Sequence, residues 1–308
     1  MRLGVLDVGS NTVHLLVVDA HLGAQPTPQL SRKSVLRLAE HLDKHGDLIS
    51  EGADALVGAT LSARRQAAEL NCDELLPFAT SAVRDARNSS QVLARVKKET
   101  GVELQVLSGE DEAVLTFLAV RRWFGWSAGR LLCLDIGGGS LELAVGTDEV
   151  PEVALSVPLG AGRLTREWLD GDPPTKLSID QLRDHVADQL AEPARKLLSS
   201  GPPDRVVASS KTFRTLARLT GAAPSSAGPR VSRSLQVNGL RQLIGFISRI
   251  PSADLAELDG VSPARAHQTL AGAVVAEQAM HALGVTEFEL SPWALREGLI
   301  LRRLDQLR

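Results

Sequence analysis

The chain is poor in cysteine, with only two, Cys72 and Cys133, among 308 residues. Both stand in apolar stretches, so we expect reduced core residues of a cytoplasmic protein and no disulfide framework. The N-terminus lacks the ordered charged, apolar and small-residue regions of a signal peptide. The apolar segment 3–18 is interrupted by Asp7 and is too short to span a bilayer, so no membrane segment is expected either.

An excess of one charge is also missing. The 34 Lys and Arg and the 37 Asp and Glu leave a net charge of −3, which does not indicate a nucleic-acid partner. An anionic ligand would need a local basic lining. The 7 histidines are scattered without metal-ligand spacing, and the turn directly after His41 and His45 favours surface positions for both. The length and the 44% hydrophobic content fit two packed domains.

Two segments of the chain share one design: an apolar strand, an aspartate at its end, a Gly/Ser turn and a second strand. The two turns read Asp7-Val8-Gly9-Ser10-Asn11-Thr12 and Asp135-Ile136-Gly137-Gly138-Gly139-Ser140. A single turn of this kind is compatible with an ordinary hairpin. Two copies indicate two related halves with a ligand cleft between them.

The two turns predict a phosphate clamp with a metal ion. A Gly-rich turn brings backbone N–H groups close to a bound anion, and hydroxyl and amide side chains add donors. The predicted phosphate ligands are Ser10, Asn11, Thr12, Gly138, Gly139 and Ser140. The aspartates suit a hard cation, and period-2 alternation places a third carboxylate on the same strand face as Ser140. The predicted metal carboxylates are Asp7, Asp135 and Glu142.

The repeated turns resemble the two phosphate loops of the actin / sugar kinase superfamily. Further segments resemble the exopolyphosphatase / guanosine pentaphosphate phosphohydrolase (Ppx/GppA) family, and they follow the family's order over nearly the whole chain. These segments are Ala79–Asn88 (ATSAVRDARN), Ser108–Ala113 (SGEDEA), Gly160–Thr165 (GAGRLT) and Leu295–Gly298 (LREG).

The resemblance implies an α/β fold with two ribonuclease H-like domains and an interdomain cleft. The first domain is expected at 1–126, joined by a C-terminal helix at 291–308, and the second at 127–290. A short form is implied, without the additional C-terminal helical domain of longer relatives. Periodicity and turn residues predict strands at 3–7, 13–19, 75–79, 102–106, 131–135, 141–146, 205–208 and 287–290. They predict helices at 53–70, 90–99, 110–124, 212–219, 266–283 and 293–307, and one that a capping box, Ser178–Gln181, opens.

Hydrolysis of a phosphoanhydride needs an in-line water, a group that orients or deprotonates it, and positive charge on the phosphoryl group. Glu112 follows a strand and the Ser108-Gly109 turn, and it matches the family's catalytic acid, so we predict that it is the general base. The alternative is that the acids at 110–112 only favour a helix N-terminus. Mg²⁺ is the predicted cofactor, with Mn²⁺ in its place and an additional monovalent cation left open.

Three basic residues are candidates for the substrate, and a fourth, Arg296, is singled out by the resemblance alone. Arg84 suits bidentate phosphate binding, unless it only forms a salt bridge with Asp85 or a neighbour. Arg163 lies in a family segment and is expected to extend the phosphate track. Lys211 stands in a turn where relatives have a Gly pair; it crowds an adenine but suits a phosphate, and the alternative is a solvated helix start. Arg296 matches a family position, and its alternative role is to tie down the terminal helix.

Together these residues and the resemblance imply an exopolyphosphatase that removes terminal phosphate from inorganic polyphosphate, preferably from short chains. One alternative substrate is guanosine pentaphosphate. A kinase is a second alternative, because fold does not fix function. Lys211 disfavours it. A sensor that binds polyphosphate or nucleotides without turnover is a third, which Glu112 disfavours. Guanosine pentaphosphate and nucleotides are also expected as ligands or inhibitors, and a homodimer is expected.

Overall fold

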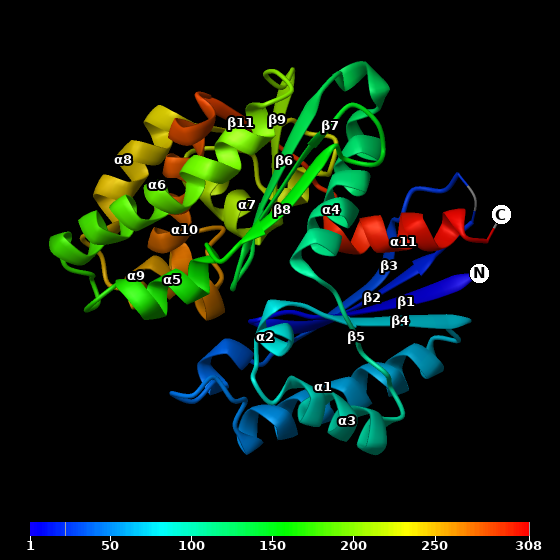
Figure 1. Ribbon diagram of the computed structural model, residues 1–308. Helices are drawn as coiled ribbons and strands as arrows, with labels where there is room; N and C mark the ends of the chain where they lie inside the picture. Colours follow the sequence, from blue (N-terminus) through cyan, green and yellow to red (C-terminus); the bar gives the residue numbers. More distant parts are fainter. Residues whose placement is uncertain (22, 308) are drawn as a thin grey trace. The chain divides into compact units, whose positions relative to one another are not determined.

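The computed structural model describes residues 1–21 and 23–307 (Figure 1). This part of the chain divides into two compact units. Unit 1 comprises Met1–Glu112 and the C-terminal segment from Leu295, and unit 2 comprises Ala113–Ala294. The division falls within the first turn of α4 (Gly109–Phe124), whereas the sequence placed it after residue 126.

Unit 1 is built on a five-stranded sheet in the order β3-β2-β1-β4-β5. Strands β1, β2 and β3 are antiparallel, and β4 and β5 continue the sheet in parallel. Helices α1 and α3 cover one face, where Leu6, Leu15 and Leu56 are buried, and α11 lies along the other (Figure 1). The bounds are β1 Arg2–Val8, β2 Thr12–Asp19, β3 Pro28–Val35, α1 Ser50–Glu69, β4 Glu74–Ala79, α2 Ser81–Arg84, α3 Ser89–Thr100, β5 Gln105–Val106 and α11 Leu295–Asp305.

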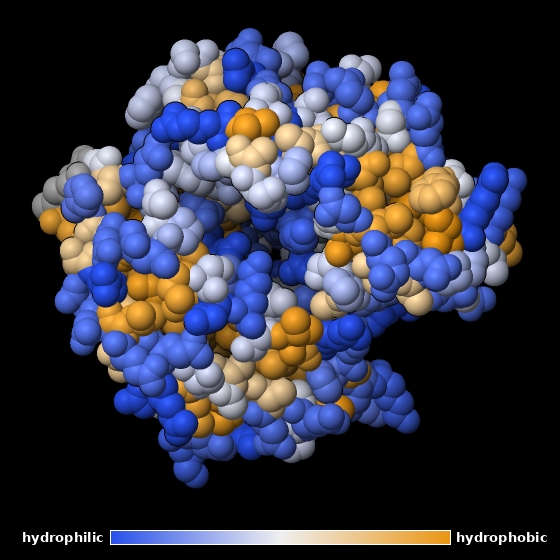
Figure 2. Space-filling model, turned by 180° about the vertical axis from the view of Figure 1, so that it is seen from behind, coloured by the Kyte–Doolittle hydropathy of each residue, from blue (hydrophilic) through white to orange (hydrophobic). Residues whose placement is uncertain are grey.

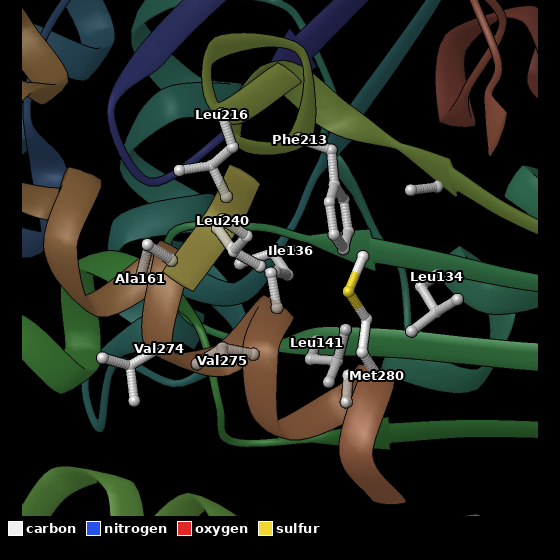
Figure 3. Close-up of a cluster of buried hydrophobic side chains, with 14 of the residues drawn as sticks. Leu134, Ile136, Leu141, Ala161, Phe213, Leu216, Leu240, Val274, Val275 and Met280 are labelled. Carbon is white, nitrogen blue, oxygen red and sulfur yellow. The ribbon is translucent and has the colours of Figure 1, made fainter. Parts of the chain in front are cut away.

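Unit 2 is built on a six-stranded sheet in the order β10-β11-β9-β6-β7-β8. Alternate residues of β6 face opposite sides, as the period of 2 requires. Leu134 and Ile136 pack with Phe213 and Met280 in the helical layer (Figure 3), while Cys133 packs toward α4. The bounds are β6 Leu131–Ile136, β7 Leu141–Gly146, β8 Val153–Val157, α5 Ala161–Trp168, α6 Lys176–Leu198, β9 Arg205–Ser209, α7 Ser210–Leu219, β10 Ser234–Gln236, α8 Val237–Ile247, α9 Ser252–Leu255, α10 Thr269–Leu283 and β11 Glu287–Leu290.

The two units repeat one supersecondary arrangement. In each, an antiparallel hairpin, β1–β2 or β6–β7, is flanked by a parallel strand, β4 or β9. The register is also repeated, because Asp7 pairs with His14 and Asp135 pairs with Glu142. The predicted α/β fold with two related halves is confirmed at the level of each unit.

Several expected elements are corrected. The helix expected to open with a capping box at Ser178 begins at Lys176, because the side chain of Thr175 caps it by accepting from Ser178 N–H at 3.2 Å. The strand expected at 102–106 is reduced to β5, and the helix expected from residue 266 starts with the 3₁₀ turn Pro263–Gln268. Strands β3, β8 and β10 and helices α5 and α8 were not predicted. The polar pattern of β3 is explained by its place at the sheet edge, where most of its side chains are exposed.

Both cysteines are free thiols. Burial raises the pKa of Cys133, and the nearby charge of Asp135 raises it further, so this thiol is unreactive at neutral pH. Within the described residues no helix is long and apolar enough to cross a membrane. Figure 2 shows one face of the molecule, on which hydrophobic residues form separate patches among hydrophilic ones.

Candidate active site

The turn between β6 and β7 is held from one side by α5. The carbonyl of Gly137 accepts from Ala161 N–H at 3.0 Å, and the carbonyl of Gly138 accepts from Arg163 N–H at 2.9 Å. The third carbonyl, that of Gly139, accepts from Arg163 Nε–H at 2.9 Å. The first turn of α5 therefore fixes three successive peptide groups.

These carbonyls decide where the N–H groups of the turn point. In a planar trans peptide the C=O and the following N–H point in opposite directions. The N–H groups of Gly138, Gly139 and Ser140 consequently point away from α5. Successive N–H groups on one side of a turn form a concave site for an anion. This orientation is what the predicted phosphate contacts require, although phosphate binding itself stays a prediction.

The turn between β1 and β2 closes in the same way as its counterpart in unit 2. Gly9 N–H donates to the carbonyl of Thr12 at 3.0 Å, and Gly137 N–H donates to the carbonyl of Ser140 at 2.9 Å. The two turns therefore share a backbone hydrogen bond as well as a sequence pattern.

The carbonyls of the unit 1 turn are also fixed from one side. Amides of the segment 36–39 donate to the carbonyls of Ser10 and Asn11 at 3.0–3.3 Å. The N–H groups of Asn11 and Thr12 therefore point to the opposite side. The Ser10 hydroxyl is buried and lies 2.9 Å from the hydroxyl of Ser81. Each unit thus presents a short row of backbone donors.

Gly160 packs directly against the unit 2 turn. A Cβ at this position would lie far inside 3.0 Å of backbone atoms of Gly139 and Ser140. The φ of Gly160 is −73°, which any residue can adopt, so the space and not the dihedral angle demands glycine. The neighbouring Gly162 is less constrained, since a Cβ there would lie 2.9 Å from the Gln268 side chain, which can move, and 3.1 Å from the Gly138 carbonyl oxygen. The sequence segment resembling the family's Gly-x-x-Arg-Leu-Thr pattern is the support of this turn.

Two of the predicted metal carboxylates, Asp135 and Glu142, are neighbours across β6 and β7. The hydroxyl of Ser209 donates to Asp135 Oδ2 at 2.5 Å, and the hydroxyl of Ser156 donates to Glu142 Oε1 at 3.0 Å. Glu142 is buried. Two ordered carboxylates at one turn fit Mg²⁺, which keeps several water ligands and binds few protein groups.

Asp7, the third predicted metal carboxylate, lies in unit 1. Its Oδ2 is 3.7 Å from Nε of Arg296 on α11. Among the residues that the structure describes, no group of three or more His, Cys, Asp or Glu side chains is arranged as a metal site. The three-carboxylate set therefore stays a prediction, and the Asp135–Glu142 pair is the part that the structure brings together.

Glu112 and Asp111 have separate tasks at the start of α4. The Asp111 carboxylate accepts from the Ser108 hydroxyl at 2.7 Å, while Ser108 Oγ accepts from Asp111 N–H at 3.0 Å. This reciprocal pair caps the helix, as a capping box does. The helix-start role considered for the acids at 110–112 is thus fulfilled by Asp111. Glu112 is 7% exposed and its carboxylate instead contacts Arg84.

Arg84 contacts three groups: the Glu112 carboxylate, the Leu107 carbonyl and the Asp85 carboxylate. Its Nη1 contacts Glu112 Oε1 and donates to the Leu107 carbonyl at 3.1 Å, and its Nε donates to Asp85 Oδ1 at 3.1 Å. Burial lowers the pKa of Arg84, but the charges of Glu112 and Asp85 outweigh it, so the pKa of the guanidinium lies above its ordinary value. The salt bridge with Asp85, which was the alternative role, is present. Phosphate binding by Arg84 stays a prediction.

The other two basic candidates are engaged by backbone carbonyls of unit 2. Arg163 supports the turn through Gly139, as described above. Lys211 Nζ donates to the carbonyl of Gly260 at 3.2 Å. Lys211 also lines a small cavity of about 20 Å³ with Arg265 and Ser262, which has room for one water molecule. The structure therefore shows supporting contacts for both side chains, and their contacts with substrate stay predictions.

Three residues near these groups were missed in the sequence. Gly160 shapes the unit 2 turn, Ser209 holds Asp135, and His14 lies opposite Asp7. A signal for His14 was available, because Asp7 and His14 have the same spacing as Asp135 and Glu142. Superposing the two turns by sequence would have singled out that position. No comparable signal pointed to Ser209, whose role depends on the pairing of β6 with β9.

The repeated hairpins and their flanking strands define an α/β protein of the actin-like ATPase fold. Two solved structures share this fold over almost the whole chain. An exopolyphosphatase from Cytophaga hutchinsonii aligns with a TM-score of 0.89 at 24% identity, covering 100% of this chain and 99% of its own. The PPX-GPPA enzyme of Aquifex aeolicus aligns with a TM-score of 0.80 at 25% identity, covering 98% and 99%.

The chain belongs to the Ppx/GppA phosphatase family, whose model matches residues 17–307. Exopolyphosphatase 1 of Mycobacterium tuberculosis is 65% identical over 305 residues, which cover 99% of this chain and 89% of the relative. Exopolyphosphatase 1 of Mycobacterium leprae is 62% identical over 305 residues, with 99% and 90% covered. The family implied by the sequence motifs is therefore confirmed.

Proposed function

We propose that the protein is an exopolyphosphatase, which hydrolyses the terminal phosphoanhydride bond of inorganic polyphosphate. The observation that carries this proposal is the 65% identity, over 99% of the chain, to a protein named exopolyphosphatase 1. The two rows of backbone donors support it, because a polyphosphate end presents closely spaced anionic oxygens. Backbone N–H donors suit phosphoryl oxygens and need neither a base nor a sugar for binding.

Glu112 is proposed as the general base that takes a proton from the attacking water. Its burial and its contact with Arg84 hold the carboxylate in one place, as a base must be held. The contacts of Arg84 with Glu112, Asp85 and Leu107 use Nη1 and Nε. Its Nη2 edge is therefore proposed to face a phosphoryl oxygen, so that one side chain orients both the base and the substrate.

Mg²⁺ is the proposed cofactor, and Mn²⁺ satisfies the same oxygen ligands. Asp135 and Glu142 would hold it, with Asp7 as a third carboxylate. A divalent ion supplies positive charge to the phosphoryl group in the transition state.

Arg163 and Lys211 are proposed to act near the substrate as well. The expected preference for short chains and the expected homodimer belong to the same proposal.

Guanosine pentaphosphate is the second candidate substrate, since the family name covers both activities. The turn at Ser209, Ser210 and Lys211 disfavours it. Ser210 has a φ of 95°, a conformation typical of glycine, and Lys211 adds a long cationic side chain at the start of α7. A nucleoside would meet bulk and charge there, whereas a bare phosphate chain would meet only the charge.

The test is phosphate release from polyphosphates of graded length, beside guanosine pentaphosphate and ATP, with Mg²⁺ present. We expect release from polyphosphate without any acceptor. Release from guanosine pentaphosphate alone would favour the second substrate, transfer to an acceptor would favour a kinase, and binding without release would favour a sensor. Each of these three outcomes contradicts the proposed reaction.

The role of Glu112 is tested by Glu112→Gln, which keeps the size of the side chain and removes the base. Loss of a general base costs about 10²–10⁴ in rate. We expect turnover to fall by that factor while polyphosphate still binds. Glu110→Gln is the matched control, because Glu110 is an exposed acid in the same helical turn. Equal activity of the two variants would remove Glu112 from the mechanism.

A further inference from the structure

The C-terminal helix α11 carries two arginines that reach the sheet of unit 1. Arg303 Nε is 2.9 Å from Glu74 Oε2 on β4, and Arg296 Nε is 3.7 Å from Asp7 Oδ2 on β1. Both pairs are partly buried, with side chains 21–30% exposed. The two pairs differ in their partner: Glu74 lies at the far end of its strand from the turns, whereas Asp7 borders the β1–β2 turn.

Arg296 is itself held by a buried histidine. Its Nη1 lies 3.4 Å from His14 Nε2, and His14 Nε2 lies 2.7 Å from the hydroxyl of Ser31. Because arginine can only donate, a hydrogen bond from Arg296 requires the tautomer in which Nε2 is the acceptor and the ring proton resides on Nδ1. His14 is 5% exposed and pairs with Asp7 on one side and with Lys33 on the other. The guanidinium of α11 is thus contacted by residues of β1 and β2, and β3 supports it through His14.

We propose that Arg296 is a positioning residue for Asp7, and that His14 and Ser31 keep its guanidinium in place. The proposal rests on the proposed function, in which Asp7 is one of the cation-binding carboxylates. Arg296 restrains that carboxylate and compensates its charge. Its alternative role, tying down the terminal helix, is shared by Arg303, which makes Arg303 a matched control on the same helix.

The test compares Arg296→Met with Arg303→Met. Both variants lose one ion pair of α11, so we expect similar decreases of a few degrees in Tm. Only Arg296→Met should lose kcat, by about tenfold or more, because a displaced carboxylate is costly in a preorganised site. It should also bind Mn²⁺ about fivefold more tightly in an electron paramagnetic resonance titration without substrate, because a positive charge beside a cation-binding carboxylate is removed.

Two histidine variants keep the test decisive if Arg296→Met does not fold. His14→Leu removes the acceptor and should reproduce part of the loss in kcat, whereas His14→Gln offers an amide oxygen and should restore it. Equal kcat losses in Arg296→Met and Arg303→Met, or wild-type kcat in His14→Leu, would overturn the proposal. A wild-type protein that releases no phosphate from polyphosphate would refute the proposed function instead, and the Mn²⁺ titration would still decide the role of Arg296.

Discussion

Replacing Gly160 by alanine adds one methyl group behind the β6–β7 turn of unit 2. The backbone φ of −73° suits alanine, so the variant tests packing alone. The new Cβ would overlap backbone atoms of Gly139 and Ser140, which cannot rotate away as a side chain would. To reach the ordinary contact range of 3.4–4 Å, the turn must move by about 1 Å.

That displacement should cost both stability and rate. Inserting a methyl group into a packed site costs about 1–3 kcal/mol, which lowers Tm by several degrees in a chain of this size. A misplacement of about 1 Å costs on the order of 10²-fold in rate, because the N–H groups of the turn would no longer meet the phosphoryl oxygens that they are proposed to bind. We therefore expect kcat to fall about 10²-fold, well beyond what the loss of stability explains at 25 °C.

The assay is phosphate release from a short polyphosphate at 25 °C, with Tm measured on the same samples. Gly245→Ala is the control, since Gly245 lies within α8 and a Cβ there meets nothing within 4 Å. It should keep wild-type activity and gain about 0.5–1 kcal/mol in stability. Gly162→Ala should fall between the two. Wild-type kcat in Gly160→Ala would refute the claim that the position of this turn matters for turnover.

Two further predictions follow from the turns of unit 2. Asp135→Asn should raise the Mg²⁺ concentration for half-maximal phosphate release about tenfold. Glu152→Gln should not, because it alters an ion pair with Arg130 at the end of the hairpin away from the turn. An unchanged Mg²⁺ titration in Asp135→Asn would contradict the metal assignment. Ser210→Gly should remove about 1–2 kcal/mol of backbone strain at φ 95° and raise Tm. Ser209→Gly, at φ −119°, should lower Tm. A decrease of Tm in both variants would contradict the claim that the backbone of Ser210 is strained.

Local sequence signals predicted the parts of the fold that are determined locally. The turn residues after Asp7 and Asp135 marked both hairpins, and α3, which ends just before Gly101 with its φ of 69°, lies within one residue of the expected range 90–99. Periodicity failed where tertiary position decides. The edge strand β3 has no apolar alternation to detect, and α5 is short and overlaps the segment Gly160–Thr165, which was interpreted only as a motif. The start of α6 was misplaced because two polar residues three apart, Thr175 and Ser178, both resemble a cap.

In the candidate site, too, the local sequence predicted some features, and tertiary structure determined the others. Sequence motifs identified the residue types that carry charge and hydrogen-bond donors, such as Glu112 and Arg84. Except for Asp85, which adjoins Arg84 in the sequence, their partners were not predictable, because strand pairing and helix packing bring them from distant parts of the chain. Ser209 reaches Asp135 across 74 residues, and Arg296 reaches His14 across 282. Arg163 shows a further limit: its type suggested a phosphate ligand, and no sequence signal indicated that it also supports the Gly139 carbonyl.

The two hairpins have similar backbones but different charges, and this difference bears on the cation. In unit 2 the residue opposite Asp135 is Glu142, so the turn is bordered by two carboxylates. In unit 1 the residue opposite Asp7 is His14, which contacts an arginine that also faces Asp7. A divalent cation is attracted more strongly by two neighbouring negative charges than by one that a guanidinium partly compensates. The unit 2 turn therefore attracts a divalent cation more strongly than the unit 1 turn does, so we expect Asp135 and Glu142 to contribute more than Asp7 to the binding of the proposed Mg²⁺.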